Sequence, residues 1–246
     1  MKDKQNQFYT SISKYYSEIF PYKPVQLQFV KNGVGDLNKK QILDIGCATG
    51  ELAFNLAKEF AEVTGIDLNE DLLQQAKNNK IISTLKFQSG NMLELKKDFQ
   101  PNQFDAVLCF GNTLVHLPNF DLIGEMLMGV YSVLKTGGSF LIQILNYDYI
   151  LAEQVSELPI IETENIKFVR KYEFEKSSPL IRFQTDLHLK KEGRVISNET
   201  VLLALKSAEL IDLLRNSGFK EIKLFSNFKK DSFGGKHLPL VVSMVK

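Results

Sequence analysis

The sequence lacks several features that would assign it to a special class. Its two cysteines, Cys47 and Cys109, are too few for a disulfide framework or for a zinc site made of cysteines. The 30 lysines and arginines are balanced by 29 aspartates and glutamates, so the basic excess typical of nucleic-acid binders is missing. There is no run of about 18 apolar residues, and residues 1–10 lack the apolar core of a signal peptide. We therefore expect a cytoplasmic protein that binds neither nucleic acid nor membrane.

What remains is the composition of an ordinary globular chain. Its 246 residues are 44% hydrophobic and 24% charged, which is enough to bury a sizeable core. Residues 1–40 are polar and aromatic, and we expect them to form a helical lid on the domain that follows. Residues 41–246 contain no linker or repeat and read as one domain.

Between residues 41 and 150, short apolar segments alternate with amphipathic ones. Strands buried on both faces of a parallel sheet are apolar throughout, and amphipathic helices cover such a sheet. The expected strands are 41–46, 62–68, 84–90, 104–112 and 139–146, and the expected helices are 50–60, 69–79, capped by Asn69, and about 120–134. The sequence thus predicts an α/β fold with a doubly wound sheet.

The pattern changes after residue 149. Residues from about 160 to 203 hold three strand-like segments, at 166–175, 180–190 and 194–205. Their period-two alternation indicates an antiparallel β insertion with one buried face. Its exposed strand edges offer a route to a homo-oligomer. A helix at 207–219 and strands at 221–228 and 238–245 are expected to follow.

The most specific motif lies where the first expected strand ends. Asp44, Gly46 and Gly50 form a strand-to-helix turn, and Asp67 ends the next strand. Glycines let the backbone approach a ligand closely, and an acidic residue at the second strand end can accept hydrogen bonds from ribose hydroxyls. The spacing Gly46-x-x-x-Gly50 differs from the dinucleotide fingerprint. Because Asp44 would repel a pyrophosphate, the motif favours a cationic or zwitterionic nucleoside ligand.

The segment Asp44-x-Gly46-x-x-Thr49-Gly50, followed by Gly65-Ile66-Asp67, resembles class I S-adenosylmethionine (SAM) dependent methyltransferases. The resemblance covers residues 41 to about 150, and the family's C-terminal helix and strand hairpin fit 207–246. It implies a Rossmann-like, mostly parallel methyltransferase sheet with an antiparallel C-terminal hairpin. It also implies an enzyme that uses SAM as cofactor, releases S-adenosylhomocysteine and moves the methyl group by in-line displacement.

The resemblance further implies which residues bind the cofactor. Asp44 and the loop after it would contact the methionine half, and the family usually has glycine where Ala48 stands. Asn91 stands where the family often has an aspartate that reads the adenine amino group, and its carbonyl can accept the same hydrogen bond. A turn residue after a strand is the alternative interpretation of Asn91. The implied cofactor-binding residues are Asp44, Gly46, Cys47, Ala48, Gly50, Asp67, Leu68, Asn91, Met92 and Phe110.

The loop at 110–118 should face the acceptor, because ligands of open α/β sheets bind beyond the carboxyl ends of the strands. It lacks the N/D-P-P-Y signature of enzymes that methylate amino groups of nucleic-acid bases. It also lacks the two glutamates of protein arginine methyltransferases. With residues 146–151, it looks most like glycine and sarcosine N-methyltransferases. This favours a small-molecule amine acceptor in contact with Asn112 and Tyr147. His116 is a candidate general base, and a histidine packed at a helix start is the alternative.

Arg170 falls among apolar residues on the expected inner face of the insertion. Arginine suits recognition of a carboxylate, and its burial without an anion would be costly. We therefore expect Arg170 to bind an acidic group of the substrate, and an ion pair with Glu173 or Asp186 is the alternative. Asn146 and Asp148 alone are too few ligands for a divalent cation, so no metal site is predicted.

Two other functions stay open at this stage. One is a SAM-binding protein without catalysis, and the other is a nicotinamide-dependent oxidoreductase, which the glycine spacing disfavours. The acceptor atom is also open, because an amine, a hydroxyl or a carboxylate would each be compatible with the sequence.

Overall fold

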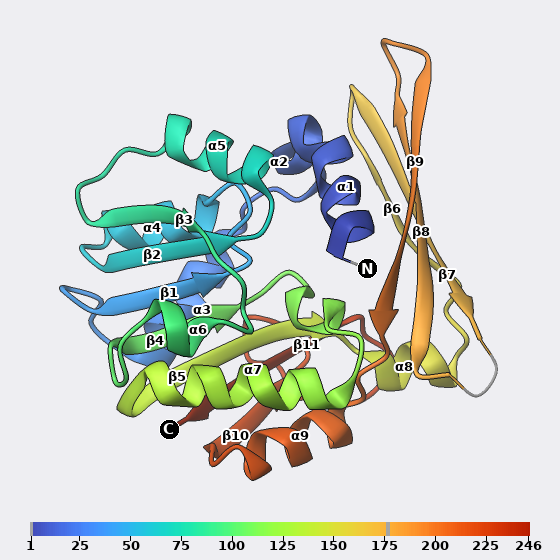
Figure 1. The fold of residues 1–246 in the computed structure, drawn as a ribbon. Helices are drawn as coiled ribbons and strands as arrows, with labels where there is room; N and C mark the ends of the chain where they lie inside the picture. Colours follow the sequence, from blue (N-terminus) through green and yellow to red (C-terminus); the bar gives the residue numbers. More distant parts are fainter. Residues whose placement is uncertain (1, 176–177) are drawn as a thin grey trace.

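Two β-sheets organise the chain, with a short N-terminal helical segment between them (Figure 1). The computed structural model describes residues 2–175 and 178–246. The larger sheet has seven strands in the order β10-β11-β5-β4-β1-β2-β3. Its strands are β1 (Gln41–Ile45), β2 (Glu62–Asp67), β3 (Leu85–Ser89), β4 (Phe104–Cys109), β5 (Leu134–Leu145), β10 (Lys220–Phe225) and β11 (Pro239–Val245).

The first five of these strands run parallel, and β11 is antiparallel to both of its neighbours. The predicted doubly wound sheet with an antiparallel C-terminal hairpin is therefore confirmed. Helices α3 (Pro24–Val34) and α4 (Glu51–Lys58) pack on one face, and α7 (Phe120–Val133) and α9 (Ser207–Asn216) on the other. Since both faces are covered, the central strands are apolar throughout.

The remaining helices are short or lie at the sheet edge. Helix α5 packs along β2 and β3, and the Asn69 side chain caps it by accepting a hydrogen bond from Leu72 N–H, as predicted. The bounds of these remaining helices are α5 (Glu70–Asn79), α6 (Leu95–Asp98), η2 (Thr113–His116) and α8 (Tyr147–Ala152). None of the described helices is long and apolar enough to cross a bilayer.

The insertion is a second, antiparallel sheet in the order β6-β7-β8-β9. Its strands are β6 (Glu157–Glu162), β7 (Ile166–Phe174), β8 (Leu180–Leu189) and β9 (Arg194–Leu203). The predicted antiparallel insertion is confirmed, and its three expected strands are β7, β8 and β9, but β6 is a fourth strand that was not predicted. This edge strand contains Pro159, and its pairing with β7 is interrupted between Leu158 and Ile161, so it lacks a regular alternation.

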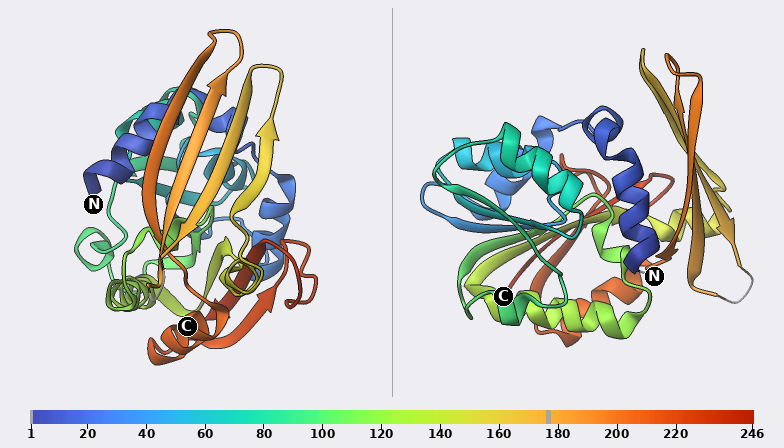
Figure 2. Two further views of the ribbon diagram at one scale, coloured as in Figure 1. Left: turned by 90° about the vertical axis from the view of Figure 1, so that its right-hand side faces the viewer. Right: turned by 45° about the horizontal axis from the view of Figure 1, so that its top comes forward.

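The N-terminal segment consists of α1 (Lys2–Ile12), η1 (Ser13–Tyr15) and α2 (Tyr16–Ile19). It lies between the larger sheet and the inner face of the insertion, as the right-hand view of Figure 2 shows. Apolar side chains fill the contact with the insertion: Phe8, Ile12, Ile19, Ile166, Phe168, Leu187 and Leu189. The outer face of the insertion is open to view on the other side (Figure 2, left).

The start of β5 also differs from the prediction, which began this strand at residue 139. The β5 strand begins at Leu134, which pairs with Phe104, and the next pair in the register is Ala106 with Ser139. Residues 135–138 therefore bulge out of the ladder. This bulge contains two glycines, Gly137 and Gly138.

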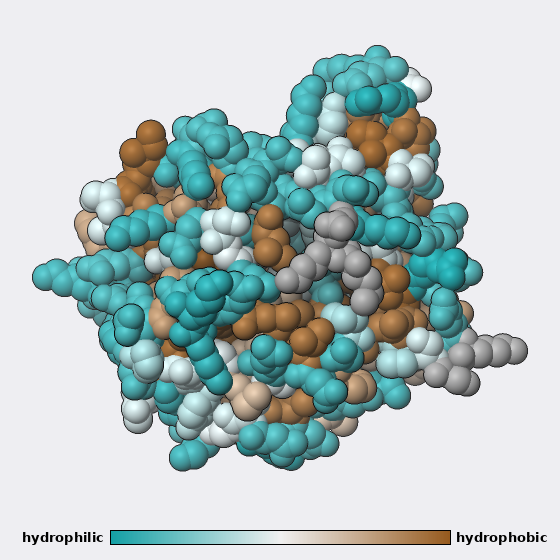
Figure 3. Space-filling view, viewed as in Figure 1, coloured by the Kyte–Doolittle hydropathy of each residue, from teal (hydrophilic) through white to brown (hydrophobic). Residues whose placement is uncertain are grey.

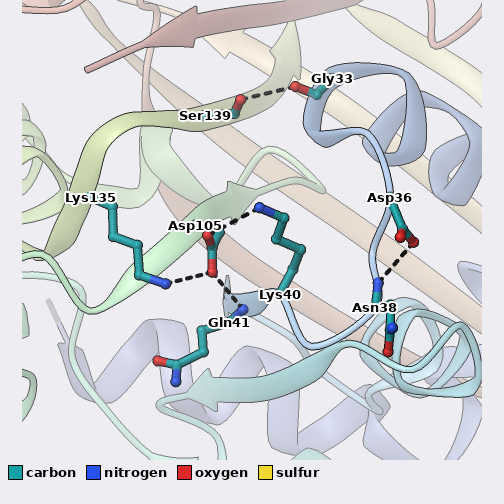
Figure 4. A network of polar contacts seen from close by, with 8 residues as sticks. All are labelled: Gly33, Asp36, Asn38, Lys40, Gln41, Asp105, Lys135 and Ser139. Atoms are coloured by element: carbon teal, nitrogen blue, oxygen red, sulfur yellow. Dashed lines mark hydrogen bonds and ion pairs between the residues drawn. The ribbon is translucent and has the colours of Figure 1, made fainter.

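Asp105 joins the amino ends of three strands of the larger sheet (Figure 4). Its carboxylate accepts hydrogen bonds from Lys135 Nζ at 2.8 Å and from the Gln41 N–H at 2.9 Å, and Lys40 Nζ lies 3.4 Å away. Burial acts to raise the pKa of Asp105, but these donors and the two lysine charges lower it below its ordinary value. The ionised carboxylate therefore stabilises the native sheet.

We expect Asp105→Asn to lower the free energy of unfolding at pH 7 by about 1–2 kcal/mol, since it weakens hydrogen bonds to a charged group. Because the native pKa is depressed, this contribution is present above the unfolded pKa of about 4 and is lost as the pH falls through the native pKa. Urea unfolding at pH 7 and pH 3 measures both effects. The control is Asp212→Asn, whose exposed carboxylate lies 4.0 Å from Arg215. Equal losses in the two variants at pH 7 would contradict the role given to Asp105.

On the face seen in Figure 3, hydrophilic side chains dominate, and apolar ones appear in small separate groups. The tip of the insertion, at the upper right, is mostly hydrophilic. The insertion exposes a few apolar side chains, Ile160, Val195 and Val201, whereas Ile166, Phe168, Leu187 and Leu189 are turned inward, toward α1. The apolar cluster of the insertion therefore faces the space between the two sheets.

Candidate active site

A cavity of about 220 Å³ lies at the carboxyl ends of β1, β2 and β4, under the N-terminal segment. This is the edge where open α/β sheets bind ligands. The residues that line it are Gln5, Asn6, Tyr9, Tyr16, Ile45, Gly46, Ala48, Asp67, Leu68, Asn69, Leu72, Gly90, Met92, Phe110, Gly111, Thr113 and His116. Segments from five separate parts of the chain therefore meet around one space.

The turn after β1 has no room for a side chain at Gly46. A Cβ atom there would lie 2.6 Å from Thr113 Oγ1, and the backbone has a φ of +72°. Ala48 also has a positive φ, +48°, which is uncommon for a residue other than glycine. This conformation explains why glycine suits the position, and why the small side chain of alanine is the next best choice.

Asp67 holds the turn after β1 against the turn after β2. Its carboxylate accepts from the Ala48 N–H and from the Asn69 N–H, each at 2.9 Å. Burial raises the pKa of Asp67, and the backbone hydrogen bonds oppose this shift by favouring the charged form. Asp67 is thus a half-buried acceptor at the edge of the cavity.

Asp44 lies directly behind the lining of the cavity and is 4% exposed. Its carboxylate has no hydrogen bond or ion pair within residues 2–175 and 178–246. Burial, together with the nearby charge of Asp67, raises the pKa of Asp44 to about 7. A buried carboxylate without a partner is costly, so the site favours a positively charged ligand group beside it.

Apolar side chains form the walls of the cavity, and three of the predicted residues, Leu68, Met92 and Phe110, are among them. Asn91 is placed differently. Its Oδ1 accepts from the Leu93 N–H at 3.1 Å, which makes a turn after β3, and its neighbours Gly90 and Met92 line the cavity. The geometry of Asn91 agrees with the turn interpretation.

Cys47, Gly50 and Asn112 shape the site without lining it. Cys47 is buried, and burial raises the pKa of its thiol. Gly50 begins α4 with a φ of +74°. Asn112 joins the ends of β4 and β5, because its Oδ1 accepts from the Leu145 N–H and its Nδ2 donates to Tyr147 Oη.

The N-terminal segment is attached to the cavity rim by hydrogen bonds. Asn69 Nδ2 donates to Asn6 Oδ1 at 2.8 Å and to Thr10 Oγ1 at 2.9 Å. Farther along the segment, Gln75 Nε2 donates to the Ser13 carbonyl, and the hydroxyls of Ser17 and Thr49 are 3.1 Å apart. Asn69 therefore connects the segment to Asp67 as well as capping α5.

A contact between Tyr9 and His116 closes the cavity on the side of η2. Tyr9 Oη and His116 Nε2 are 2.9 Å apart, and the second ring nitrogen, Nδ1, is buried without a partner among the described residues. Burial lowers the pKa of His116 to about 4 and raises that of Tyr9. Both groups are therefore neutral near pH 7.

The other predicted residues lie next to the cavity or farther away. Tyr147 is fully buried in α8, and Arg170 is half-buried on the inner face of β7. Asn146 caps α8, and Asp148 accepts from the Ser207 N–H, so both have structural partners.

The loop at 110–118 lines the cavity through Phe110, Gly111, Thr113 and His116, but sequence reasoning missed most of the lining that comes from other segments: Gln5, Asn6, Tyr9, Asn69, Leu72 and Gly90. Asn69 carried a signal only as a helix cap. Tyr9 carried none, because it is separated from His116 by 107 positions.

Comparisons with known proteins identify the family. Residues 36–175, more than half of the chain, match the family described as "Methyltransferase domain". Glycine N-methyltransferase of Oryctolagus cuniculus is 32% identical over 129 residues, covering 46% of this chain and 43% of that protein. Ubiquinone biosynthesis O-methyltransferase of Coxiella burnetii is 32% identical over 128 residues, covering 51% and 52%. The chain thus spans about half the length of these curated relatives.

The match to solved structures extends over the whole chain. An S-adenosylmethionine-dependent methyltransferase from Clostridium acetobutylicum superposes with a TM-score of 0.79 at 18% identity, covering 98% of both chains. At this identity the likeness shows the fold, and the matched family region carries the assignment. The chain belongs to the class I SAM-dependent methyltransferases.

Proposed function

We propose that the protein transfers a methyl group from SAM to a small-molecule acceptor, an amine in preference to a hydroxyl. The observation that carries the proposal is that Gly46 and Asp67 line one cavity at the carboxyl ends of β1 and β2, with the buried Asp44 next to the lining residue Ile45 in β1. A cationic nucleoside ligand needs a close backbone approach, an acceptor for ribose hydroxyls and a buried negative charge. These three residues supply one each.

The residues of the cavity fit SAM by their chemistry. Asp67 would accept from the ribose hydroxyls, and Leu68 and Met92 would flank the adenine ring. Asp44, which has no partner of its own, would balance the positive charge of the methionine half. The turn at 46–50 would contact the same half through its backbone. The N-terminal segment would then act as a lid, since it covers the cavity and attaches through Asn69.

When bound, SAM supplies a methyl group on a positively charged sulfur. In-line attack by a nitrogen lone pair would form the N–C bond, and the electron pair of the C–S bond would pass to sulfur. The chain's own contribution is to hold the acceptor in line, which can lower the barrier by up to about 7–11 kcal/mol in favourable cases. Tyr9 and His116, from the lid and from η2, line the cavity next to each other and are suited to orient an acceptor.

The neutral Tyr9–His116 pair supports an amine acceptor. A hydroxyl acceptor requires a base that takes its proton during transfer, and a histidine with a pKa of about 4 is a poor one. An amine that arrives deprotonated already has its lone pair and needs orientation only. Among relatives, one is named as an N-methyltransferase and another as an O-methyltransferase, so the preference rests on this pair. His116 is accordingly proposed as an orienting residue instead of the general base expected from sequence.

Calorimetric titration with SAM, S-adenosylhomocysteine and NAD tests the cofactor. We expect both sulfur ligands to bind and NAD to be rejected, because Asp44 disfavours a pyrophosphate. Asp67→Ala should weaken S-adenosylhomocysteine by about tenfold or more, since two ribose hydroxyls lose their charged acceptor.

The matched control for this titration is Glu62→Ala, at the exposed amino end of the same strand. Glu62→Ala should leave both affinities unchanged. Absence of binding of either sulfur ligand to the wild-type protein would rule out the proposed function.

The pH dependence of SAM binding should report Asp44. Because burial places its pKa near 7 and a cationic ligand favours the ionised form, affinity should be constant above about pH 7 and fall by up to about tenfold per pH unit below it. Asp44→Asn should remove this slope and lower the affinity at pH 8. Adenosine, which lacks the methionine half, is the control ligand and reports any titration of Asp67. The same slope for SAM in Asp44→Asn would refute the assignment.

The rate profile should distinguish orientation from base catalysis. If His116 orients a neutral amine, kcat/KM for the acceptor, measured with SAM saturating at every pH, should rise with pH up to the pKa of the acceptor, without an inflection between pH 5 and 8. His116→Asn and Tyr9→Phe should each lower kcat by about 10–100-fold, within the range of mispositioning effects, and keep the shape of the profile. A profile in which only His116→Asn loses an inflection near pH 6–7 would restore the general base.

A further inference from the structure

Three buried polar atoms without a partner gather on the inner face of the insertion. They are Arg170 Nε, Tyr172 Oη and Thr185 Oγ1, among the five such side-chain atoms in residues 2–175 and 178–246. Buried polar groups in native proteins are almost always paired, and an unpaired one costs about 1–3 kcal/mol. A cluster of three therefore calls for a ligand.

The register of the strands explains how they come together. Arg170 on β7 pairs directly with Thr185 on β8, and Tyr172 follows Arg170 on the same face. Residues paired in this way share one face of an antiparallel sheet. An apolar pair, Phe168 with Leu187, flanks them on one side, where it packs on α1. The cluster thus interrupts an otherwise apolar surface.

No acidic side chain of the described strands serves this cluster. Glu173 and Asp186 face the other side of the sheet, where they contact Arg182 and Ser197. The expected alternative, an ion pair of Arg170 with Glu173 or Asp186, is not formed. Arg170 instead donates from Nη2 to the Pro159 carbonyl at 2.7 Å, which uses one of its five N–H donors.

All three unpaired groups can donate a hydrogen bond. The Arg170 Nε–H is a donor only, and the hydroxyls of Tyr172 and Thr185 can each point a proton toward an acceptor. Together with the positive charge of the guanidinium, these donors match an oxyanion. Charge-assisted bonds of this kind are about twice as strong as neutral ones.

A chain of polar contacts leads from this cluster to the active site. Asn112, at the end of β4, donates to Tyr147 Oη at 3.2 Å. The Tyr172 hydroxyl lies near the Tyr147 hydroxyl without forming a well-aligned hydrogen bond. The two groups are close enough for each to shift the pKa of the other. Asn112 is flanked in sequence by Gly111 and Thr113, which line the cavity. The cluster is therefore a near neighbour of the space proposed for the acceptor.

We propose that Arg170, Tyr172 and Thr185 form a subsite for an acidic group of the methyl acceptor, a carboxylate or a phosphoryl group. The inference rests on the proposed function, because it assigns this cluster to the substrate of that reaction. Tyr172 and Thr185 hold the oxyanion beside Arg170, and the amine end of the same molecule reaches toward Tyr9 and His116. The substrate class is thus an acidic amine, such as an amino acid or an amino phosphate.

The small number of arginines makes a direct test possible. The chain has four, Arg170, Arg182, Arg194 and Arg215, so protein labelled with ¹⁵N-arginine gives four Nε signals. The Arg170 signal is identified by its loss in Arg170→Lys. We expect acetate or inorganic phosphate to shift this signal saturably, while the Arg182 signal, from the outer face, stays in place. Acetamide, the neutral analogue of acetate, should shift neither.

Variants separate the subsite from general charge effects. Arg170→Lys keeps the charge but loses the planar fork, so it should weaken the preferred acid, followed through backbone amide signals, by about tenfold. Thr185→Val, which removes one hydroxyl at similar volume, should weaken it by about threefold to tenfold. Arg182→Lys is the matched control and should change nothing. The stronger of the two acids identifies the group, carboxylate or phosphoryl.

S-adenosylhomocysteine titrated into the same samples reports folding and the cofactor site. If it binds, and neither acid shifts the Arg170 signal more than those of Arg182 and Arg194, the acidic subsite is refuted and the proposed function stands. If the acids bind through Arg170 but S-adenosylhomocysteine does not, the proposed function fails and the assignment of the subsite to a methyl acceptor fails with it.

Discussion

The carboxylate of Asp67 is the point on which the geometry of the active site depends. It accepts from two backbone N–H groups in the turns after β1 and β2, so it fixes those turns relative to each other. Asn69, whose backbone is one of the two donors, uses its side chain to hold α1 and to cap α5. One half-buried acid thus sets the positions of the first turn, of a helix and of the segment that covers the cavity. The same acid faces the ligand space, so structural and binding roles coincide in a single side chain.

Burial determines the charge state of every group around the cavity. Asp44 and Asp67 are pushed toward the protonated form, whereas His116 and Tyr9 are held neutral. In the family of SAM-dependent methyltransferases, this environment is suited to a ligand that brings its own positive charge. The surface of the insertion is organised in the opposite way, because its outer face pairs acids with bases and its inner face keeps one unpaired base, Arg170. The larger sheet thus places acidic groups, and the insertion a basic group, beside the space between the two sheets.

The sequence allowed the central sheet to be predicted well, because β1, β2 and β4 are buried on both faces and their apolar character does not depend on distant partners. It also located Gly46 and Asp67, whose roles arise within one turn. The contacts that failed to show in the sequence are those between distant segments, such as Tyr9 with His116. The β6 strand escaped because Pro159 and a bulge disturb its alternation. The Asn91 side chain forms a local turn by accepting from the Leu93 N–H, whereas the resemblance implied that it contacts the adenine amino group.

The two sides of the N-terminal segment are held by different forces. Toward the insertion, Phe8, Ile12 and Ile19 are buried in an apolar cluster, whereas toward the cavity rim the attachments are mainly hydrogen bonds. Hydrogen bonds exchange readily with water, but apolar burial does not. Opening of the proposed lid would therefore break the polar contacts, and the segment would move together with the insertion. Because the contacts that part are mainly hydrogen bonds, we expect a small heat-capacity change for this opening, so that cooling would alter the balance between open and closed forms little.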